Sequence, residues 1–398
     1  MTTTSAVTHA DPVAGDVLRR YARSFLDDSS IAVISAERFD LVRSNSRLAG
    51  WCVTDCATAF ETPSAPAATS AELVIETSGT TGTPKMVRYS KNAIRTCADA
   101  IADGIPLDPS REYVALVNPR LAYGLSIVHS HLLAGVPVHF AAAPVSLHSW
   151  REFRHTLRPN SSVYLVPHQS FLLAQDESWS LPEPVEFIFA GGPFTELMAG
   201  RLRPVFPNAT VVNMYGQAEL GPRISIGRSP LAEFREGDVG KPLPGVQVRI
   251  ACDAPDAVGP VEVASRFQMS SYFDSDGDAG PAPPKWWNTG DLGRMSANGH
   301  IHIAGRDAPD VNFLGSRVDL STLRTLALEA DGVLDCRVSA VDHPVYGQQP
   351  SLRVLTKAAD PGAERRIRRA LAVAVGTSAS AVAITIVDIA ALPDSGKL

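Results

Sequence analysis

The chain has few cysteines, little net charge and no long apolar run, and each shortage excludes a class of protein. Its 398 residues include five cysteines, an odd number at scattered spacings, which predicts reduced thiols rather than a disulfide framework or a zinc site. The formal charge of −6 argues against a nucleic-acid binder that neutralises phosphates. No segment approaches the ~20 apolar residues that span a bilayer, and the N-terminus lacks a signal peptide's apolar core. We therefore expect a cytoplasmic protein without membrane or nucleic-acid partners.

What the chain does have is a regular alternation of short apolar runs with longer segments able to form helices. The runs are rich in Val, Ile and aromatic residues: ELVIET, YVALVNP, VPVHFA, SVYLVP, VEFIFAGG and TVVNMYG. Such alternation favours βαβ units and a largely parallel sheet. Before it, apolar spacing predicts a helix over residues 17–26, and an Ala/Pro/Ser/Thr-rich stretch at residues 57–71 predicts a linker.

The pattern changes near residue 245, where VQVRIA and GPVEVAS predict a smaller β-rich part that ends near HIHIAG. The last ninety or so residues predict helices over 320–329 and 364–375 with strands at CRVSAV, SLRVLT and AITIVDI. The fold class is therefore α/β. We expect a large N-terminal domain over residues 1–304, with mostly parallel sheets and a β-rich subdomain, and a small mobile α+β domain over residues 305–398.

The strongest chemical signal is Thr77-Ser-Gly-Thr-Thr-Gly-Thr-Pro-Lys85, directly after the run ELVIE. Glycines and hydroxyl residues after a strand let backbone N–H and side-chain O–H groups approach a phosphate closely, and Lys85 adds a cation. A Walker A loop, and with it a P-loop kinase, is disfavoured because Gly79 and Gly82 are too close and Met86 follows the lysine. The alternative is a flexible surface loop.

Further segments follow this loop in order: Ala190-Gly-Gly-Pro193, Met214-Tyr-Gly-Gln-Ala-Glu219, Gly237-Asp-Val-Gly-Lys-Pro-Leu-Pro244, Asn288-Thr-Gly-Asp291, Gly305-Arg306, Val341-Asp-His-Pro-Val-Tyr-Gly347 and Ser395-Gly-Lys397. Over residues 72–398 this ordered set resembles the superfamily of acyl-CoA synthetases, peptide-synthetase adenylation domains and luciferases. The resemblance implies ATP-dependent activation of a carboxylic acid to acyl-AMP with release of pyrophosphate. Acyl transfer would follow, with coenzyme A as the leading acceptor.

The resemblance also implies roles for individual residues. The pyrophosphate side of ATP would be held by Thr77, Ser78, Gly79, Thr80, Thr81, Gly82 and Lys85. Adenine and ribose would be bound by Gly191, Gly192, Tyr215, Gly216, Asp291 and Arg306. Glu219 would help to hold Mg²⁺, a hard cation suited to carboxylate and phosphate oxygens. Lys397 would reach from the small domain to the carboxylate and the α-phosphate, so that the catalytic set is Lys397, Glu219 and Lys85.

Four departures from the family's pattern leave the second half-reaction open. Ala218 stands where the family usually has Thr, and Ala308 with Pro309 stands at the hinge that rotates the small domain. The terminal lysine motif is short, and Thr77 lies unusually near the N-terminus. A carrier-protein phosphopantetheine or an amine is the alternative acceptor, the latter making the enzyme an amide synthetase. From another class, a non-catalytic nucleotide-binding relic of the fold remains.

The acyl pocket is expected at Tyr123, Gly124 and Leu125, within Pro119-Arg-Leu-Ala-Tyr-Gly-Leu125. Ala-Tyr-Gly-Leu is similar to aryl-acid ligases such as benzoate-CoA ligase. The segment has no Asp to hold an α-ammonium group, so an aryl or other non-amino acid is favoured over an amino acid. Tyr123 is equally compatible with a place in the core.

Other polar clusters have simpler interpretations. Asp274-Ser-Asp-Gly-Asp278 lacks the glycine and glutamate positions of a calcium loop, which favours a solvated acidic loop. His129 and His131 lie in an apolar stretch and are expected in the core or a pocket rather than on a metal. The arginines at residues 365–369 fall on one amphipathic helix, as a solvated face or, alternatively, a contact for a coenzyme A phosphate or a carrier protein.

Overall fold

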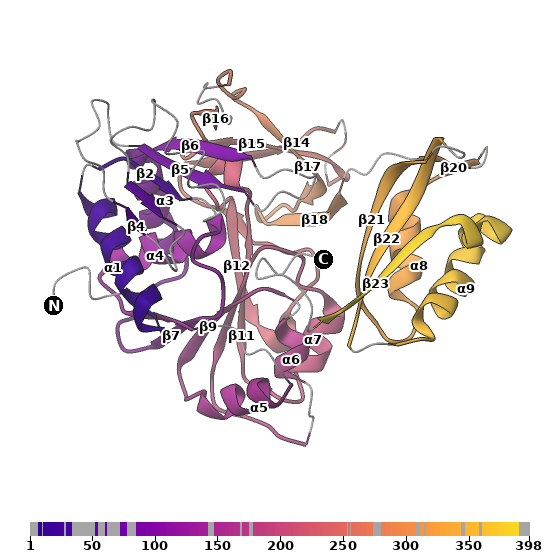
Figure 1. Ribbon diagram of the computed structural model, residues 1–398, viewed down its shortest axis with the longest axis horizontal. Helices are drawn as coiled ribbons and strands as arrows, with labels where there is room; N and C mark the ends of the chain where they lie inside the picture. Colours follow the sequence, from indigo (N-terminus) through magenta and orange to yellow (C-terminus); the bar gives the residue numbers. More distant parts are fainter. Residues whose placement is uncertain are drawn as a thin grey trace.

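The computed structural model describes residues 7–9, 11–27, 29–33, 52–54, 60–61, 72–77, 85–141, 147–167, 169–174, 178–252, 254, 256–273, 280–306, 311–313, 316–343, 347–357 and 360–389. Figure 1 shows a large unit built from sheets and helices and, beside it, a smaller unit formed by the C-terminal elements. The structure thus has the expected α/β class.

The first sheet of the large unit is mostly parallel. Its order is β1 (Val7–His9), β8 (Val138–Phe140), β7 (Glu112–Ala115), β9 (Ser161–Leu165), β10 (Glu186–Phe189), β11 (Thr210–Tyr215), β12 (Ser225–Pro230) and β13 (Lys241–Pro242), with only β12 and β13 antiparallel to their neighbours. The strands predicted from five of the apolar runs are therefore confirmed. Helices cover this sheet on both sides, so its central strands are buried throughout.

Alternate residues of one central strand show which helices cover which face. Phe187 and Phe189 of β10 pack in a core with α5 (Leu147–Thr156), α6 (Gln169–Leu173) and α7 (Glu196–Leu202). Ile188, between them, packs in a second core with α3 (Lys91–Gly104) and α4 (Ala122–Ala134). Successive strand side chains point to opposite faces, so one continuous apolar run serves both cores.

The second sheet is built around the strands that flank the predicted phosphate loop. Its order is β16 (Ser271–Phe273), β6 (Met86–Ser90), β5 (Glu72–Glu76), β2 (Ile31–Val33), β3 (Cys52–Thr54) and β4 (Phe60–Glu61). Helix α1 (Pro12–Leu26) packs with this sheet in the core that contains Ile188. The helix begins five residues earlier than predicted. The earlier start has a clear cause: the Asp11 carboxylate accepts bonds from the N–H groups of Val13 and Ala14 at 2.8 and 2.9 Å.

The predicted β-rich part is an antiparallel sheet of β14 (Val246–Ile250), β15 (Gly259–Ser265), β17 (Trp287–Met295) and β18 (Ile301–Arg306). Within the first sheet, short 3₁₀ turns join its last strands: η4 (Ala218–Leu220) lies between β11 and β12, and η5 (Leu231–Glu233) lies between β12 and β13. In Figure 1, β16, β17 and β18 lie in the upper part of the large unit; the Tyr215 hydroxyl at the end of β11 bonds to Asp291 of β17, and the Tyr272 hydroxyl of β16 bonds to Glu219 of η4. The three sheets therefore meet where the predicted nucleotide-binding segments lie.

The small unit follows the predicted order of elements. It contains β19 (Val311–Phe313), β20 (Ser316–Val318), α8 (Leu320–Leu328), β21 (Val333–His343), β22 (Gly347–Thr356), α9 (Ala363–Val375), η6 (Gly376–Ala381) and β23 (Ala383–Asp388). Its core is separate, but Leu355 and Ile389 pack into the core of the large unit. The predicted hinge residues Ala308 and Pro309 lie outside the described residues, and the domain boundary at residues 304 and 305 stays a prediction.

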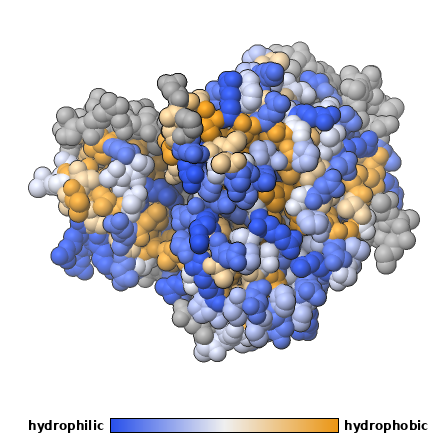
Figure 2. All heavy atoms as spheres, turned by 180° about the vertical axis from the view of Figure 1, so that it is seen from behind, coloured by the Kyte–Doolittle hydropathy of each residue, from blue (hydrophilic) through white to orange (hydrophobic). Residues whose placement is uncertain are grey.

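Hydrophilic side chains are spread over both units on the face seen in Figure 2, with apolar ones between them. Within the described ranges, none of the helices has the length and apolar character needed to cross a membrane.

Candidate functional site

The two ends of the predicted phosphate loop are fixed by one hairpin. The N–H of Thr77 donates to the carbonyl of Lys85 at 2.7 Å, and the N–H of Lys85 donates to Oγ1 of Thr77 at 3.1 Å. These bonds continue the antiparallel pairing of β5 with β6. The other loop candidates, Ser78, Gly79, Thr80, Thr81 and Gly82, lie outside the described residues. The structure therefore sets where the loop starts and ends.

Lys85 and Glu219, far apart in the sequence, meet at Tyr272. The Lys85 ammonium lies 4.9 Å from the centre of the Tyr272 ring, and the Tyr272 hydroxyl donates to Oε1 of Glu219 at 2.9 Å. Burial raises the pKa of Tyr272, and the Glu219 charge raises it further, so this hydroxyl stays a neutral donor. The tyrosine reaches this place because β16 pairs with β6, the strand that leaves the loop. One side chain thus links the two predicted catalytic residues.

The turn that carries Glu219 is held from several sides. The Tyr89 hydroxyl of β6 donates to the carbonyl of Ala218, and the Cys97 thiol of α3 donates to the carbonyl of Gly221 at 2.8 Å. The N–H of Met269 donates to the carbonyl of Glu219 at 2.9 Å. These contacts use the backbone, so Ala218 keeps the turn in place without the hydroxyl that the family usually has there.

Asp291 is the centre of a second cluster. Its Oδ2 accepts from the Tyr215 hydroxyl at 2.5 Å and from the Gln217 amide at 3.5 Å, while its Oδ1 lies 2.9 Å from Nε of Arg306. Burial raises the pKa of Asp291, and Arg306 and Tyr215 partly offset this effect. The pairing of β17 with β18 sets Asp291 opposite Arg306, whose side chain is 67% exposed. The predicted ribose-binding residues are therefore together, with the arginine facing solvent.

The predicted adenine segment lies at the adjacent strand end. Gly191 and Gly192 follow β10, and Tyr215 and Gly216 end or follow β11, its parallel neighbour. A Cβ on Gly216 would come within 2.1 Å of the carbonyl oxygen of Pro222, so the chain passes too close for any side chain. The carboxyl ends of neighbouring parallel strands are where ligands bind in α/β sheets.

The predicted acyl segment forms the first turn of α4. The Tyr123 hydroxyl donates to the carbonyl of Ile188 at 2.8 Å, Leu125 is fully buried, and a Cβ on Gly124 would lie 2.1 Å from the Asn118 carbonyl oxygen. An ion pair joins this segment to the strand before the phosphate loop, because Arg120 lies 3.5 Å from Glu76. The acyl segment and the strand that leads into the loop are thus neighbours.

Three residues near these clusters were not predicted from the sequence. Tyr272 and Gln217 are described above, and the third is Arg223, which lies 4.6 Å from the centre of the Tyr123 ring and is 3% exposed. Gln217 lies inside a quoted motif, but Tyr272 and Arg223 lie outside every motif. Only their position in the fold reveals them.

The prediction that His129 and His131 belong to the core is confirmed. Nε2 of His129 lies 2.6 Å from the Tyr21 hydroxyl, and Nε2 of His131 lies 2.8 Å from the Tyr164 hydroxyl. Burial lowers the pKa of His129 to about 3 and that of His131 to about 4, so both are neutral. Outside the core, Arg366 pairs with Asp360 and Arg368 with Glu364, as expected for a solvated helix face.

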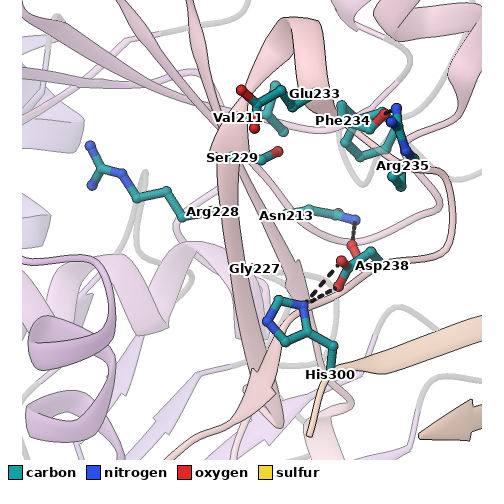
Figure 3. A pocket seen from close by; sticks show the side chains of 10 residues that line it. All are labelled: Val211, Asn213, Gly227, Arg228, Ser229, Glu233, Phe234, Arg235, Asp238 and His300. Carbon is teal, nitrogen blue, oxygen red and sulfur yellow. Dashed lines mark hydrogen bonds and ion pairs between the residues drawn. The ribbon is translucent and has the colours of Figure 1, made fainter. Parts of the chain in front are cut away.

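A separate small pocket explains part of the predicted segment at residues 237–244. Figure 3 shows Asp238 facing His300, whose Nδ1 lies 3.0 Å from Oδ1, while Arg228 points away from them. The same Oδ1 accepts from the N–H of Gly240, and the Asp238 carbonyl accepts from the Asn213 amide. This aspartate therefore fixes its own turn against β11 and β18. None of these bonds involves a residue of the Asp291 cluster.

The residues present are compatible with a magnesium ion held mainly by phosphate. In the part of the chain that the structure describes, no group of three or more His, Cys, Asp or Glu side chains is arranged to hold a metal. Glu219 can supply one carboxylate, and Mg²⁺ is commonly held by one or two carboxylates together with substrate phosphates. The predicted catalytic Lys397 lies outside the described residues.

Comparisons with known proteins show which family the chain matches and which proteins it is similar to. A family model described as AMP-binding enzyme matches residues 16–273. The chain is 26% identical over 320 residues to a malonate–CoA ligase of Arabidopsis thaliana, covering 72% of this chain and 51% of that protein. It is 24% identical over 293 residues to a D-alanine–D-alanyl carrier protein ligase of Lactococcus lactis, covering 71% and 58%. The chain thus spans between half and three fifths of the length of these relatives.

The fold has a counterpart among solved structures. An amide bond synthetase from Marinactinospora thermotolerans matches 98% of this chain and 87% of its own, with a TM-score of 0.62 and 18% identity. At this identity the match shows a shared fold.

Proposed function

The chain belongs to the AMP-binding enzyme family, and we propose that it uses ATP to convert a carboxylic acid into its acyl-AMP with release of pyrophosphate. The observation that carries the proposal is the meeting of Lys85 and Glu219 at Tyr272. A cation at the end of a glycine-rich loop and a carboxylate facing it suit the two sides of a magnesium-bound triphosphate. The proposal thus rests on position as well as on motifs.

In the proposed reaction, a carboxylate oxygen of the acid attacks the α-phosphorus of ATP. The bond between this phosphorus and the oxygen of the leaving pyrophosphate breaks, and both products carry negative charge. Because attack brings like charges together, fixed donors and cations must lie where charge accumulates. We assign this task to Lys85 and the loop from Thr77 to Gly82, while magnesium held by Glu219 would neutralise phosphate charge.

We assign nucleotide binding to the second cluster. Asp291 would accept from the ribose hydroxyls, and Arg306, on the exposed side of the same ion pair, can donate to the nucleotide. Tyr215 would flank the adenine while its hydroxyl holds the Asp291 carboxylate, and the bare backbone at Gly191, Gly192 and Gly216 lets the base approach the strand ends. The Tyr215 hydroxyl and the Arg306 guanidinium hold the Asp291 carboxylate in one position, and a fixed acceptor lowers the cost of binding.

We further propose two domains, residues 1–304 and residues 305–398, with a hinge at Ala308 and with Lys397 brought from the small domain to the acid and the α-phosphate. The acyl group would lie at Tyr123, Gly124 and Leu125, and we favour an aryl or other non-amino acid. Coenzyme A is the proposed acceptor. The names of the relatives and of the structural neighbour leave a carrier protein or an amine as alternatives.

The test is exchange of labelled pyrophosphate into ATP over a panel of aryl, fatty and amino acids, repeated with coenzyme A and scored for thioester. We expect acid-dependent exchange, a loss of about a hundredfold or more in Lys85→Met, and near-normal rates in Lys357→Met, which removes an exposed lysine of the small unit. Lys397→Ala should abolish exchange while ATP binding stays nearly intact. The proposal is contradicted if folded protein shows no exchange with any acid of the panel. Binding of ATP without exchange would instead indicate a non-catalytic nucleotide-binding relic of the fold.

A further inference from the structure

Arg223 is a buried cation without an acidic partner. The residue is 3% exposed, Nη1 donates to the carbonyl of Pro222 at 2.5 Å, and Nη2 donates to the Ser126 hydroxyl at 3.0 Å. Its Nε–H is buried and has no hydrogen-bond partner among the residues that the structure describes. Over the ranges that the structure describes, no carboxylate forms an ion pair with it.

The ionisable groups around Arg223 do not neutralise its charge. Burial raises the pKa of the Cys97 thiol to about 12, and burial also raises the pKa values of Tyr123 and Tyr164, so all three stay neutral. Burial lowers the pKa of Arg223 itself, yet a guanidinium keeps its proton in proteins. A hydroxyl, a carbonyl and the face of Tyr123 only partly replace lost hydration. An apolar side chain would fill the same space at lower cost, so stability alone gives no reason for the charge.

The position of Arg223 places this charge in the proposed acyl pocket. Its guanidinium lies against Tyr123 and Ser126 of α4, and its backbone follows Pro222, which packs on Gly216. Four residues earlier, Glu219 marks the phosphate side of the site. The reacting carboxylate must lie on that phosphate side, so Arg223 is available only to the part of the acid that does not react.

We propose that Arg223 binds a second carboxylate on the substrate, so that the enzyme activates a dicarboxylic acid at one of its two carboxyl groups. This proposal rests on the proposed function. A guanidinium offers Nε–H and Nη–H in a fork that matches the two oxygens of a carboxylate. The unpartnered Nε–H supplies one donor, and Nη2 supplies the other by exchanging Ser126 for the substrate. Nη1 keeps its bond to Pro222, so the fork stays in place.

The same arrangement rejects acids that lack the second charge. A monocarboxylic acid of equal length would leave Arg223 buried and unpaired, with an apolar group against it. A site built to bond a polar group discriminates strongly against the analogue that lacks it, and we expect a preference of about a hundredfold or more in kcat/KM for the diacid.

The test compares each dicarboxylic acid, aliphatic or aryl, with its monomethyl ester and with the acid that has a methyl group in place of the second carboxylate. Two readouts are used: pyrophosphate exchange, and equilibrium binding to the ATP-loaded protein by calorimetry. Arg223→Met keeps the length and removes the charge, and Arg223→Lys keeps the charge without the fork. Arg266→Met, which removes an exposed arginine, is the control. Circular dichroism and a thermal melt verify folding.

We expect the wild type and the Arg266→Met control to prefer the diacid in both readouts. Arg223→Met should raise KM for the diacid at least tenfold and should reverse the preference toward the monocarboxylic acid, with Arg223→Lys between them. Equal use of both acids by the wild type, or an unchanged preference in folded Arg223→Met, overturns the proposal. If Arg223→Met fails to fold, the wild-type preference decides.

The two readouts separate this proposal from the proposed function. Exchange with monocarboxylic acids alone would support acid activation and overturn the role of Arg223. Diacid binding that depends on Arg223, with no exchange for any acid, would support Arg223 as the recognition residue and overturn acid activation.

Discussion

The link between Lys85, Tyr272 and Glu219 predicts that two substitutions of one tyrosine have separable effects. Tyr272→Phe removes the hydroxyl that donates to Glu219 at 2.9 Å and keeps the ring that lies 4.9 Å from the Lys85 ammonium. Tyr272→Leu removes both contacts. The difference between these variants therefore isolates the contribution of the ring.

The size of each effect follows from the contacts. A hydrogen bond to a charged group contributes about 1.5–3 kcal/mol, and because Tyr272 is only half-buried we take the lower end, about 1.5 kcal/mol. That is about tenfold in kcat/KM for exchange. A cation–π contact at a partly exposed site contributes about 0.5–1 kcal/mol, so Tyr272→Leu should lose about a further two- to fivefold.

The assay is pyrophosphate exchange measured over a series of magnesium concentrations. Because Glu219 is the proposed magnesium ligand, Tyr272→Phe should need more magnesium to reach its maximal rate. The matched control is Tyr113→Phe, a tyrosine away from the site. It removes a hydroxyl that accepts a hydrogen bond of 2.9 Å from the Asp108 N–H. Wild-type activity in Tyr272→Phe would refute the role of the hydroxyl, and equal loss in both variants would refute that of the ring.

Three further predictions concern stability and binding. Because burial raises the pKa of Asp291, its stabilising contribution is lost as the pH rises through that raised pKa. Asp291→Asn should therefore match or exceed the wild type in a thermal melt at neutral pH, while AMP binding measured by calorimetry weakens at least tenfold. A clear loss of stability would contradict this. Gly240→Ala would place a Cβ 2.1 Å from the backbone of β12, at a residue whose φ is 73°. Denaturant titration should therefore show a loss of about 3 kcal/mol or more in the free energy of unfolding, against about 1–2 kcal/mol for Gly299→Ala, whose Cβ would meet no obstruction. Equal losses in the two variants would refute the steric argument. Because the pKa values of His129 and His131 are lowered, stability that is present above their ordinary pKa of 6.5 is lost as the pH falls, by about 2 kcal/mol per histidine at about pH 5. Urea titrations at about pH 5 and at a pH above 6.5 should show that His129→Phe removes half of this drop. An unchanged drop would show that other groups cause it.

Local patterns in the sequence were sufficient to predict most strands and helices. The runs before Thr77, Ala190 and Gly216 are continuous and apolar because both faces of their strands are buried, and this property is visible in the sequence itself. The start of α1 was misplaced because the cap at Asp11 lies outside the apolar spacing that defined the helix. Element boundaries depend on such single hydrogen bonds.

The candidate site was predictable only where its residues fall within ordered motifs. Lys85, Glu219 and Asp291 could be named in advance, but their mutual contacts could not. Tyr272 reaches Glu219 through the pairing of β16 with β6, and Arg223 reaches Tyr123 through the packing of a turn on α4. The residues of the first contact lie 53 positions apart in the chain, and those of the second lie about 100 positions apart. Long-range packing of this kind leaves no local pattern in the sequence.

The most direct test of acid activation is detection of the intermediate itself. The protein is mixed with ATP labelled at the α-phosphate, magnesium and each acid of the panel, and the quenched mixture is analysed by chromatography and mass spectrometry. We expect one class of acid to yield its acyl-AMP in an amount comparable to the enzyme, and Lys85→Met to yield far less. Folded protein that binds ATP but forms no acyl-AMP with any acid would contradict the central claim.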